Sequence, residues 1–366
     1  MFSINRNLFT YLSAFFILTS TLSATTIKPT DQRIKIQGSL YHKALSNGSV
    51  EFFRFPNNVL KYMKDRRAKA KKPSNAETTS GVKLLFKTDA KDISLKFKIN
   101  EGTVDRGSDF AVYKNGKLWK ELRFRKKKTE SYPFVFTVKL TNDSSEAVVY
   151  TVALPSYSNP IFCGMTLNDG AELKEFSVEP KKVYVAYGDS VSHGTGQRSA
   201  SYLTWPYKLS EKLGFELYNI AIGGSSIDPE RLSMFKDFKK IDLLTVYIGI
   251  NDAGKKNPQE FKKAYANLLS TIRASHPETK IVCISMHTMP EGKKGRGGFL
   301  LSDYAQPVKD VVATMKAEGD NNILLVDGTQ LAGLEDAMSP GNVHLSIKGA
   351  GKWANKLYGK IKGFVK

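Results

Sequence analysis

The stretch Val183-Tyr184-Val185-Ala186-Tyr187-Gly188-Asp189-Ser190-Val191-Ser192-His193-Gly194 decides the fold of this chain. Its first five residues form a continuous apolar run, which is typical of a parallel strand that is buried on both faces. The run stops at Gly188-Asp189-Ser190 and a glycine-rich turn. Because ligands in open α/β sheets bind where strands end, Ser190 is the first candidate for chemistry. The tripeptide alone is also an ordinary turn, in which the serine caps a helix.

The pattern after Lys181 predicts a parallel sheet with helices on both faces. The expected strands are Val183–Tyr187, Glu216–Ile222, Leu243–Ile248, Ile281–Met286 and Ile323–Val326, and the expected helices lie near 205–213, 229–239, 258–275, 303–318 and 346–362. In such a sheet the carboxyl ends of all strands lie along one edge. The residues that follow the strands therefore test whether Ser190 has chemical partners.

The chain before this point predicts an all-β domain, a sandwich or jelly roll. Expected strands are Val50–Phe55, Val82–Phe86, Ile93–Ile99, Phe110–Tyr113, Phe134–Leu140, Ala147–Leu154 and Glu172–Val178. Alternation places Leu95, Phe97 and Ile99 on one face, and Asn115-Gly116 is a strong hairpin signal. We expect a β domain over residues 25–180 and an α/β domain over 181–366.

The N-terminus predicts a secretory signal over residues 1–24. Arg6 precedes an apolar run from Leu8 to Leu18, and Ala24 offers a small residue at a cleavage position. The run is shorter than the ~20 residues that span a bilayer, so a cleaved signal is favoured over a membrane anchor. The expected location is outside the cytoplasm, secreted or periplasmic, with no integral membrane segment after cleavage.

The net charge of the chain limits the classes of molecule that the protein is expected to bind. The 366 residues carry a formal net charge of +20, which attracts anionic partners. An acidic polysaccharide and an anionic membrane surface both fit, whereas no nucleic-acid motif is present and nucleic acid is not expected. Residues 58–72 and Arg123–Lys128 are basic clusters that are either contacts for an anionic polymer or solvated faces. No metal-ligand spacing or phosphate loop is found, so no metal or cofactor is expected.

Four kinds of polar group are expected at the carboxyl edge of the sheet. Ser190 follows the first strand, Gly223-Gly224 the second and Asn251 the third, and His344 precedes the last helix. Acyl transfer needs this set, because a serine hydroxyl requires a base and the oxyanion requires donors that are already in place. An imidazole is largely neutral at physiological pH and suits the base.

In this order, Ser190, Gly224, Asn251 and His344 resemble the four signature blocks of the SGNH (GDSL-type) hydrolases. The resemblance implies a flavodoxin-like three-layer α/β/α esterase domain over residues 181–366. It implies Ser190 as nucleophile and His344 as base, with an oxyanion hole from the Ser190 and Gly224 N–H groups and the Asn251 amide. Phe53-Arg54-Phe55-Pro56 and the segment 81–89 resemble the β-sandwich that precedes the catalytic domain in a secreted bacterial subgroup.

One position departs from the family pattern. The acid that usually stands three residues before the histidine is Gly341 here. Either another carboxylate such as Asp336 orients His344, or a backbone carbonyl does, which leaves a Ser-His dyad. His193 is expected to pack in the loop beneath the site, and His287 to line the pocket. The loop 289–299, rich in Gly, Lys and Arg, is either a lid over an anionic substrate or a flexible connection.

Three functions follow as hypotheses. The first is a secreted serine esterase that removes acetyl or similar small acyl groups from carbohydrate, including an anionic polysaccharide. The second is a lipid or lysophospholipid esterase drawn to anionic membranes. The third, motivated by Gly341, is a carbohydrate-binding protein with a weakened hydrolase site.

Overall fold

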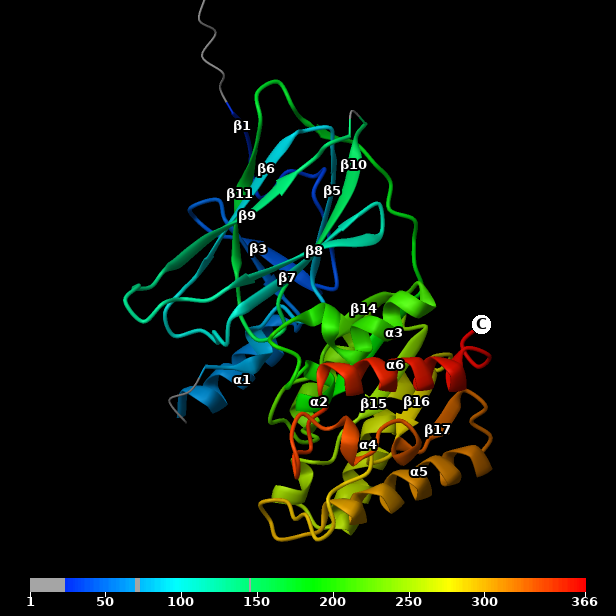
Figure 1. Cartoon of the computed structure of the whole chain (residues 1–366). Helices are drawn as coiled ribbons and strands as arrows, with labels where there is room; N and C mark the ends of the chain where they lie inside the picture. Colours follow the sequence, from blue (N-terminus) through cyan, green and yellow to red (C-terminus); the bar gives the residue numbers. More distant parts are fainter. Residues whose placement is uncertain (1–23, 70–72, 145) are drawn as a thin grey trace, which may run out of the picture.

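The computed structural model describes residues 24–69, 73–144 and 146–366. An antiparallel β structure is followed along the chain by an α/β structure (Figure 1). The expected signal segment lies outside the described residues apart from Ala24, so cleavage and export stay predictions. In the described ranges no helix has the length and apolar character to cross a membrane.

Two antiparallel sheets build the N-terminal domain. The first contains β1 (Thr25–Ile27), β3 (Tyr41–Ala44), β4 (Val50–Phe53), β6 (Asp92–Ile99), β9 (Phe134–Thr141) and β11 (Ile161–Leu167). Its main order is β3-β4-β11-β6-β9, and β1 pairs with β11. The second contains β2 (Lys35–Gln37), β5 (Lys83–Thr88), β7 (Ser108–Lys114), β8 (Lys117–Phe124), β10 (Val148–Ala153) and β12 (Leu173–Lys174). Its main order is β12-β5-β10-β7-β8, and β2 pairs with β5.

Alternation along β6 supplies one side of the core between these sheets. Leu95, Phe97 and Ile99 are fully buried, whereas Lys96 between them is exposed. The Phe97 ring lies 5.1 Å from the ring of Phe110 on β7, so side chains of the two sheets interdigitate. The predicted β-sandwich is confirmed.

The strand predictions in this domain are partly correct. Asn115 and Gly116 join β7 to β8 with φ angles of 46° and 77°, the left-handed pair that a two-residue hairpin turn needs. The short β1, β2 and β3 and the longer β8 and β11 were not among the expected strands. In β11 an irregularity between Phe162 and Met165 breaks the two-residue period on which strand prediction depends. The expected strand 172–178 is only the two-residue β12.

The C-terminal domain contains a five-stranded parallel sheet. Its strands, in spatial order, are β14 (Glu216–Asn219), β13 (Val183–Gly188), β15 (Leu243–Tyr247), β16 (Lys280–Ile284) and β17 (Ile323–Val326). Every neighbouring pair is parallel. The order 2-1-3-4-5 is the flavodoxin-like one, in which the chain changes direction between the first and third strands. The carboxyl ends of β13 and β15 therefore border the crevice where ligands bind.

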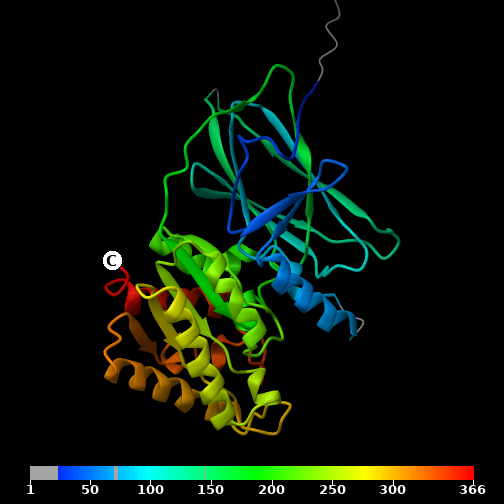
Figure 2. The same cartoon turned by 180° about the vertical axis from the view of Figure 1, so that it is seen from behind.

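Helices cover both faces of this sheet. The α-helices are α1 (Asn57–Lys69), which precedes this domain, α2 (Ser190–His193), α3 (Trp205–Leu213), α4 (Pro258–Ser275), α5 (Ala305–Ala317) and α6 (Ile347–Ile361). The 3-10 helices are η1 (Asn75–Glu77), η2 (Ser201–Leu203), η3 (Pro229–Asp237), η4 (Asp252–Gly254), η5 (Leu301–Tyr304), η6 (Gly328–Gln330) and η7 (Leu334–Asp336). α3 packs against α6 on one face, and α4 packs against α5 on the other (Figures 1 and 2). The helix expected near 229–239 is thus the 3-10 helix η3.

A buried arginine joins the two domains. Arg54, directly after β4, is 1% exposed. Its guanidinium donates to the carbonyl of Asn219 at the end of β14 and to that of Ala221 at 2.9 Å. It also donates to the carbonyls of Thr78 at 2.6 Å and Asn75 at 2.8 Å. The strand expected to continue to Ile222 ends at Asn219, and the carbonyls at its end bind Arg54 rather than another strand.

Candidate active site

Ser190 and His344 meet at the carboxyl edge of the parallel sheet. Ser190 begins α2 directly after β13, and Asp189 caps this helix by accepting a hydrogen bond from the Val191 N–H at 3.0 Å. His344 lies in the loop between η7 and α6. Ser190 Oγ is 2.8 Å from His344 Nε2. The structure therefore brings the candidate nucleophile and the candidate base within hydrogen-bond distance.

The side chain of Asn342 holds the His344 ring. Asn342 Oδ1 accepts the backbone N–H of His344 at 2.9 Å and lies 3.0 Å from Nδ1 of the same residue. Because a backbone N–H only donates, the amide atom facing the ring is the oxygen. Nδ1 therefore carries the proton, and Nε2 keeps its lone pair toward Ser190 Oγ. Sequence reasoning missed Asn342, although an amide two residues before the histidine was a visible signal.

Neither of the two expected partners, Asp336 or a backbone carbonyl, is the group at His344 Nδ1, which faces Asn342 Oδ1. Asp336 Oδ2 accepts the Gly333 N–H at 2.9 Å and the Lys352 ammonium at 2.8 Å. The carboxylate is thus committed to closing the turn of η7 and to an ion pair with α6. Gly341, where the family's acid usually stands, has a φ of 70° and forms part of the turn before His344.

The His344 imidazole is held in its neutral form. Burial first, and the Arg106 guanidinium second, lower the pKa of His344 below its usual value. Both effects disfavour the imidazolium. The ring is therefore neutral at physiological pH, which is the state that accepts a proton from a serine hydroxyl.

His193 and His287 do not line the cavity at Ser190. His193 is fully buried, where Nδ1 accepts the Gly223 N–H at 3.0 Å and Nε2 donates to the Ser156 carbonyl at 2.8 Å. It packs beneath the site, as expected, and orients the turn that contains Gly223. His287 is also buried, with Nδ1 against the Tyr247 hydroxyl, and burial lowers its pKa to about 4. Its expected place in the pocket wall is wrong, because the side chain is enclosed by the core.

Two hydrogen-bond donors line the same cavity as Ser190. Gly224 is exposed and has a φ of 82°, a conformation that a side chain would strain. Asn251 Nδ2 donates to the Ser225 carbonyl at 3.0 Å, which leaves one amide N–H for another acceptor. Asn251 makes no side-chain capping bond to η4. The arrangement can present donors to an oxyanion beside Ser190.

Both domains form the cavity, whose volume is about 610 Å³. Asn75, Arg106 and Tyr157 of the N-terminal domain line it together with Ser190 and the catalytic-domain loops. Asn75 Nδ2 donates to the Gly223 carbonyl at 2.8 Å, so the sandwich contacts the turn that presents Gly224. The sandwich is therefore one wall of the site.

The glycine-rich loop 289–299 packs against η4. A Cβ on Gly295 would lie 2.6 Å from Ala253 Cβ, so only glycine permits this approach. The Gly297 N–H donates to the Ala253 carbonyl at 3.1 Å. This contact brings Lys293 and neighbouring basic residues to the cavity wall. The loop thus lies beside the site, and whether it is a lid or a flexible connection stays a prediction.

The two basic clusters predicted from sequence are partly used inside the protein. In the first, Lys64 pairs with Glu77 at 2.7 Å, and Arg66 pairs with Asp228 of the catalytic domain. In the second, Arg125 pairs with the fully buried Asp109. These cations stabilise the sandwich and its contact with the α/β domain. A role of the clusters in binding an anionic polymer stays a prediction.

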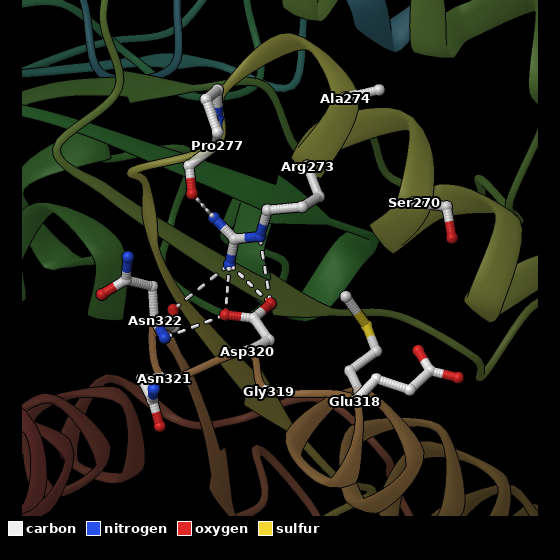
Figure 3. Close-up of a pocket in the computed structure, with 10 residues that line it drawn as sticks. Ser270, Arg273, Ala274, Pro277, Glu318, Gly319, Asp320, Asn321 and Asn322 are labelled. Atoms are coloured by element: carbon white, nitrogen blue, oxygen red, sulfur yellow. Dashed lines mark hydrogen bonds and ion pairs between the residues drawn. The ribbon is translucent and has the colours of Figure 1, made fainter.

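A second cavity, of about 620 Å³, lies at the opposite edge of the sheet between the ends of α4 and α5. Figure 3 shows that Arg273 points at Asp320, with Nε 3.0 Å from Oδ2, and that its guanidinium also donates to the Pro277 carbonyl at 2.7 Å. The Arg273 guanidinium is thus already hydrogen-bonded to other groups of the protein. The amino edge of a parallel sheet is not where such folds bind substrates, and this cavity lacks a nucleophile and base pair.

No group of three or more His, Cys, Asp or Glu side chains with metal-binding geometry occurs in residues 24–69, 73–144 and 146–366. The expectation that no metal is needed stays a prediction.

Residues 186–352 match the family model described as GDSL-like Lipase/Acylhydrolase. No curated protein matches the chain. A salicylyl-acyltransferase from a tetracycline biosynthetic pathway superposes with a TM-score of 0.76 at 19% identity, covering 93% of this chain and 97% of that one.

Two carbohydrate esterases share the two-domain architecture. A family two carbohydrate esterase from Cellvibrio japonicus has a TM-score of 0.66 at 13% identity and covers 94% of this chain and 98% of its own. An acetyl xylan esterase from Butyrivibrio proteoclasticus has a TM-score of 0.63 at 13% identity, with 95% and 100% coverage. At these identities the likeness shows the fold.

Proposed function

Because the chain carries an ester hydrolase domain of the GDSL-like lipase/acylhydrolase family over residues 186–352, we propose that the protein is a serine esterase that removes small acyl groups, acetyl above all, from carbohydrate. One observation carries the proposal. Ser190 Oγ lies 2.8 Å from a His344 ring whose tautomer Asn342 sets for accepting a proton. The carbohydrate esterases among the similar structures support the choice of substrate class.

Acylation begins when Ser190 Oγ attacks the ester carbonyl carbon and its proton moves to His344 Nε2. The tetrahedral oxyanion accepts hydrogen bonds from the backbone N–H groups of Ser190 and Gly224 and from the Asn251 amide. When the intermediate collapses, the bond between the carbonyl carbon and the sugar oxygen breaks. The sugar oxygen takes the proton from Nε2 and leaves as an alcohol.

Deacylation repeats these steps with water as the nucleophile. His344 Nε2 takes a proton from water while the hydroxide attacks the acyl-enzyme carbonyl. The same donors receive the second oxyanion, and Ser190 Oγ leaves with the proton from Nε2. The products are a carboxylic acid and the free enzyme.

The cavity wall favours a short acyl group over a lipid chain. Among the lining residues, the only aliphatic side chains are Ile250, Leu301 and Val343. Burying each methylene of a long chain stabilises a complex by ~0.8 kcal/mol only where apolar surface receives it. Three aliphatic side chains give a long acyl chain few partners, which argues against the lipid esterase.

We expect kcat/KM to fall along a series of 4-nitrophenyl esters from acetate to butyrate to octanoate, by about tenfold or more at the longest chain. The physical reason is the polar wall around Ser190. Initial rates at matched concentrations below the micellar range measure the series. A rise in kcat/KM with chain length would favour the lipid esterase, and no turnover of any ester would favour the carbohydrate-binding protein.

Asn342→Ala is expected to lower kcat about tenfold, the value of one lost hydrogen bond of ~1.4 kcal/mol to the reacting imidazole. Asn342→Asp keeps an acceptor at Nδ1 and should retain most of the turnover. Its negative charge favours the imidazolium, which raises the pKa of His344. Because the base must be neutral, the acidic limb of kcat/KM against pH should move to higher pH in Asn342→Asp.

The native pH profile is the reference for this pair of variants. Burial and Arg106 lower the pKa of His344, so the native acidic limb should lie below pH 6.5. If both variants keep native kcat and the native pH profile, Asn342 does not position the ring.

A further inference from the structure

Five cations surround the mouth of the Ser190 cavity. They are Arg106, Lys255, Lys293, Lys294 and Arg296. All five are exposed, whereas Ser190 at the base of the cavity is 8% exposed. No carboxylate stands among the residues that line the cavity, although the chain contains 35 acidic residues. The mouth is therefore strongly electropositive.

These cations differ from the basic clusters elsewhere on the chain. Within the described ranges, none of the five makes an ion pair. By contrast, Arg66 and Arg125 are paired with carboxylates. Like charges gathered without counter-charges repel one another, and binding an anion relieves this repulsion.

The carboxyl groups beside the catalytic loops do not neutralise the mouth. Asp252, next to Asn251, is fully buried and pairs with Lys256 at 2.8 Å. Asp189, next to Ser190, is also fully buried, and burial raises its pKa to about 7. Neither Asp189 nor Asp252 lines the cavity.

Arg106 is the cation that the sandwich contributes. Its guanidinium lies over the Tyr157 ring, 4.5 Å from the centroid, and the Tyr157 hydroxyl is 2.7 Å from Thr195 Oγ1 of the catalytic domain. This stacking leaves the N–H groups at the edge of the guanidinium, and within the described residues the hydrogen bonds of Arg106 involve its backbone alone. A planar guanidinium with free N–H groups on one edge can donate two parallel hydrogen bonds to a carboxylate or a sulfate.

We propose that the cavity mouth binds an anionic group, a carboxylate or a sulfate, carried by the saccharide whose acyl ester is cleaved at Ser190. This inference rests on the proposed esterase function. The acyl group must reach Ser190 at the cavity base, so the rest of the substrate lies among the five exposed cations. Arg106 binds the anion on the sandwich side, and Lys293, Lys294 and Arg296 face it from the glycine-rich loop.

Three acetylated monosaccharide substrates with the same ester position test the proposal: one neutral, one with a uronic carboxylate and one with a sulfate group. We expect kcat/KM for at least one anionic ester to exceed that of the neutral ester about tenfold or more. The advantage should shrink as salt rises from 0.02 to about 0.5 M, because exposed charges are screened. The comparison of the two anionic esters identifies which anion is preferred.

Variants locate the preference in the mouth. Arg106→Gln should lower the ratio of the anionic to the neutral kcat/KM about tenfold. Arg106→Lys should retain part of the ratio, because lysine keeps the positive charge but lacks the paired N–H donors of the guanidinium. Lys316→Gln on α5 removes the same charge from an exposed position on another part of the surface and is the matched control. Its ratio should stay native.

The outcomes separate this inference from the function on which it rests. If 4-nitrophenyl acetate is not hydrolysed in a Ser190-dependent way, the esterase proposal fails first. If it is hydrolysed but the neutral and anionic sugar esters have equal kcat/KM, the anion site alone is overturned. The same holds if Arg106→Gln and Lys316→Gln change the ratio equally, or if anionic phospholipid vesicles are hydrolysed in preference to every sugar ester.

Discussion

Ser190→Ala is expected to lower kcat by about 10⁴ to 10⁶, the loss seen when the nucleophile of a serine hydrolase is removed. The methyl group of alanine cannot form an acyl-enzyme, and His344 then has no hydroxyl to deprotonate. The residual rate comes from the oxyanion donors and from substrate binding. Hydrolysis of 4-nitrophenyl acetate measures the change, with the native enzyme counted by active-site titration and the variant by the concentration of folded protein.

Ser233→Ala is the matched control for this variant. Ser233 is an exposed serine in η3 and does not line the cavity, so its loss should leave kcat native. Thermal unfolding of both variants should match that of the native protein, because neither change removes much buried surface. A Ser190→Ala enzyme with kcat within tenfold of native would rule out Ser190 as the nucleophile.

Arg54→Met is expected to destabilise the protein by about 3 kcal/mol or more, because buried carbonyl groups lose their donor at a cost of about 1 to 3 kcal/mol each. The side chain is 1% exposed, and burial lowers the pKa of Arg54 to about 9, so the charge persists at neutral pH. Methionine fills much of the volume, yet it removes the Arg54 donor from the buried carbonyls of Thr78, Asn219 and Ala221. Urea unfolding measures the loss.

Arg66→Gln separates this effect from the mere loss of an arginine between the domains. The Arg66 side chain is 54% exposed and pairs with Asp228. An exposed pair contributes only ~0.2 to 1 kcal/mol, so this variant should be nearly as stable as the native protein. Equal losses for Arg54→Met and Arg66→Gln would contradict a special role for the buried guanidinium.

Loss of Arg54 should also disturb the position of the Gly223-Gly224 turn at the active site. Its guanidinium binds the Asn219 and Ala221 carbonyls, three residues or more before Gly224, and Asn75 reaches the Gly223 carbonyl from the same domain. The sandwich therefore supports the turn that presents an oxyanion donor. We therefore expect Arg54→Met to lower kcat on 4-nitrophenyl acetate, measured under conditions where the variant is folded.

The parallel sheet was predictable because its information is local. The apolar run Val183–Tyr187 is typical of a parallel strand buried on both faces, and the alternating helices supply the crossovers. Once the strands are parallel, their carboxyl ends share one edge, so Ser190, Gly224 and Asn251 had to lie near one another. The strand β11 escaped prediction because an irregular segment interrupts its two-residue period.

The partners of the histidines were not predictable in the same way. Asp336 had the right chemistry to orient His344, yet its carboxylate accepts hydrogen bonds from Lys352 on α6 and from the Gly333 N–H instead. Asn342 takes the role because a tight turn returns its side chain to the ring that follows it. His287 was expected in the pocket and is enclosed by the core, since the packing around Tyr247 decides where its ring lies.

By itself, the sequence determined the fold of the catalytic half and the candidate nucleophile, base and oxyanion donors, because strand periodicity and the order of strand ends constrain where such residues lie. Only the tertiary structure decided what holds His344, which domain supports the Gly223-Gly224 turn and which of many cations remain unpaired at the cavity. Those outcomes depend on competition among distant groups for the same hydrogen bonds and charges. Such competition is settled when the domains pack together.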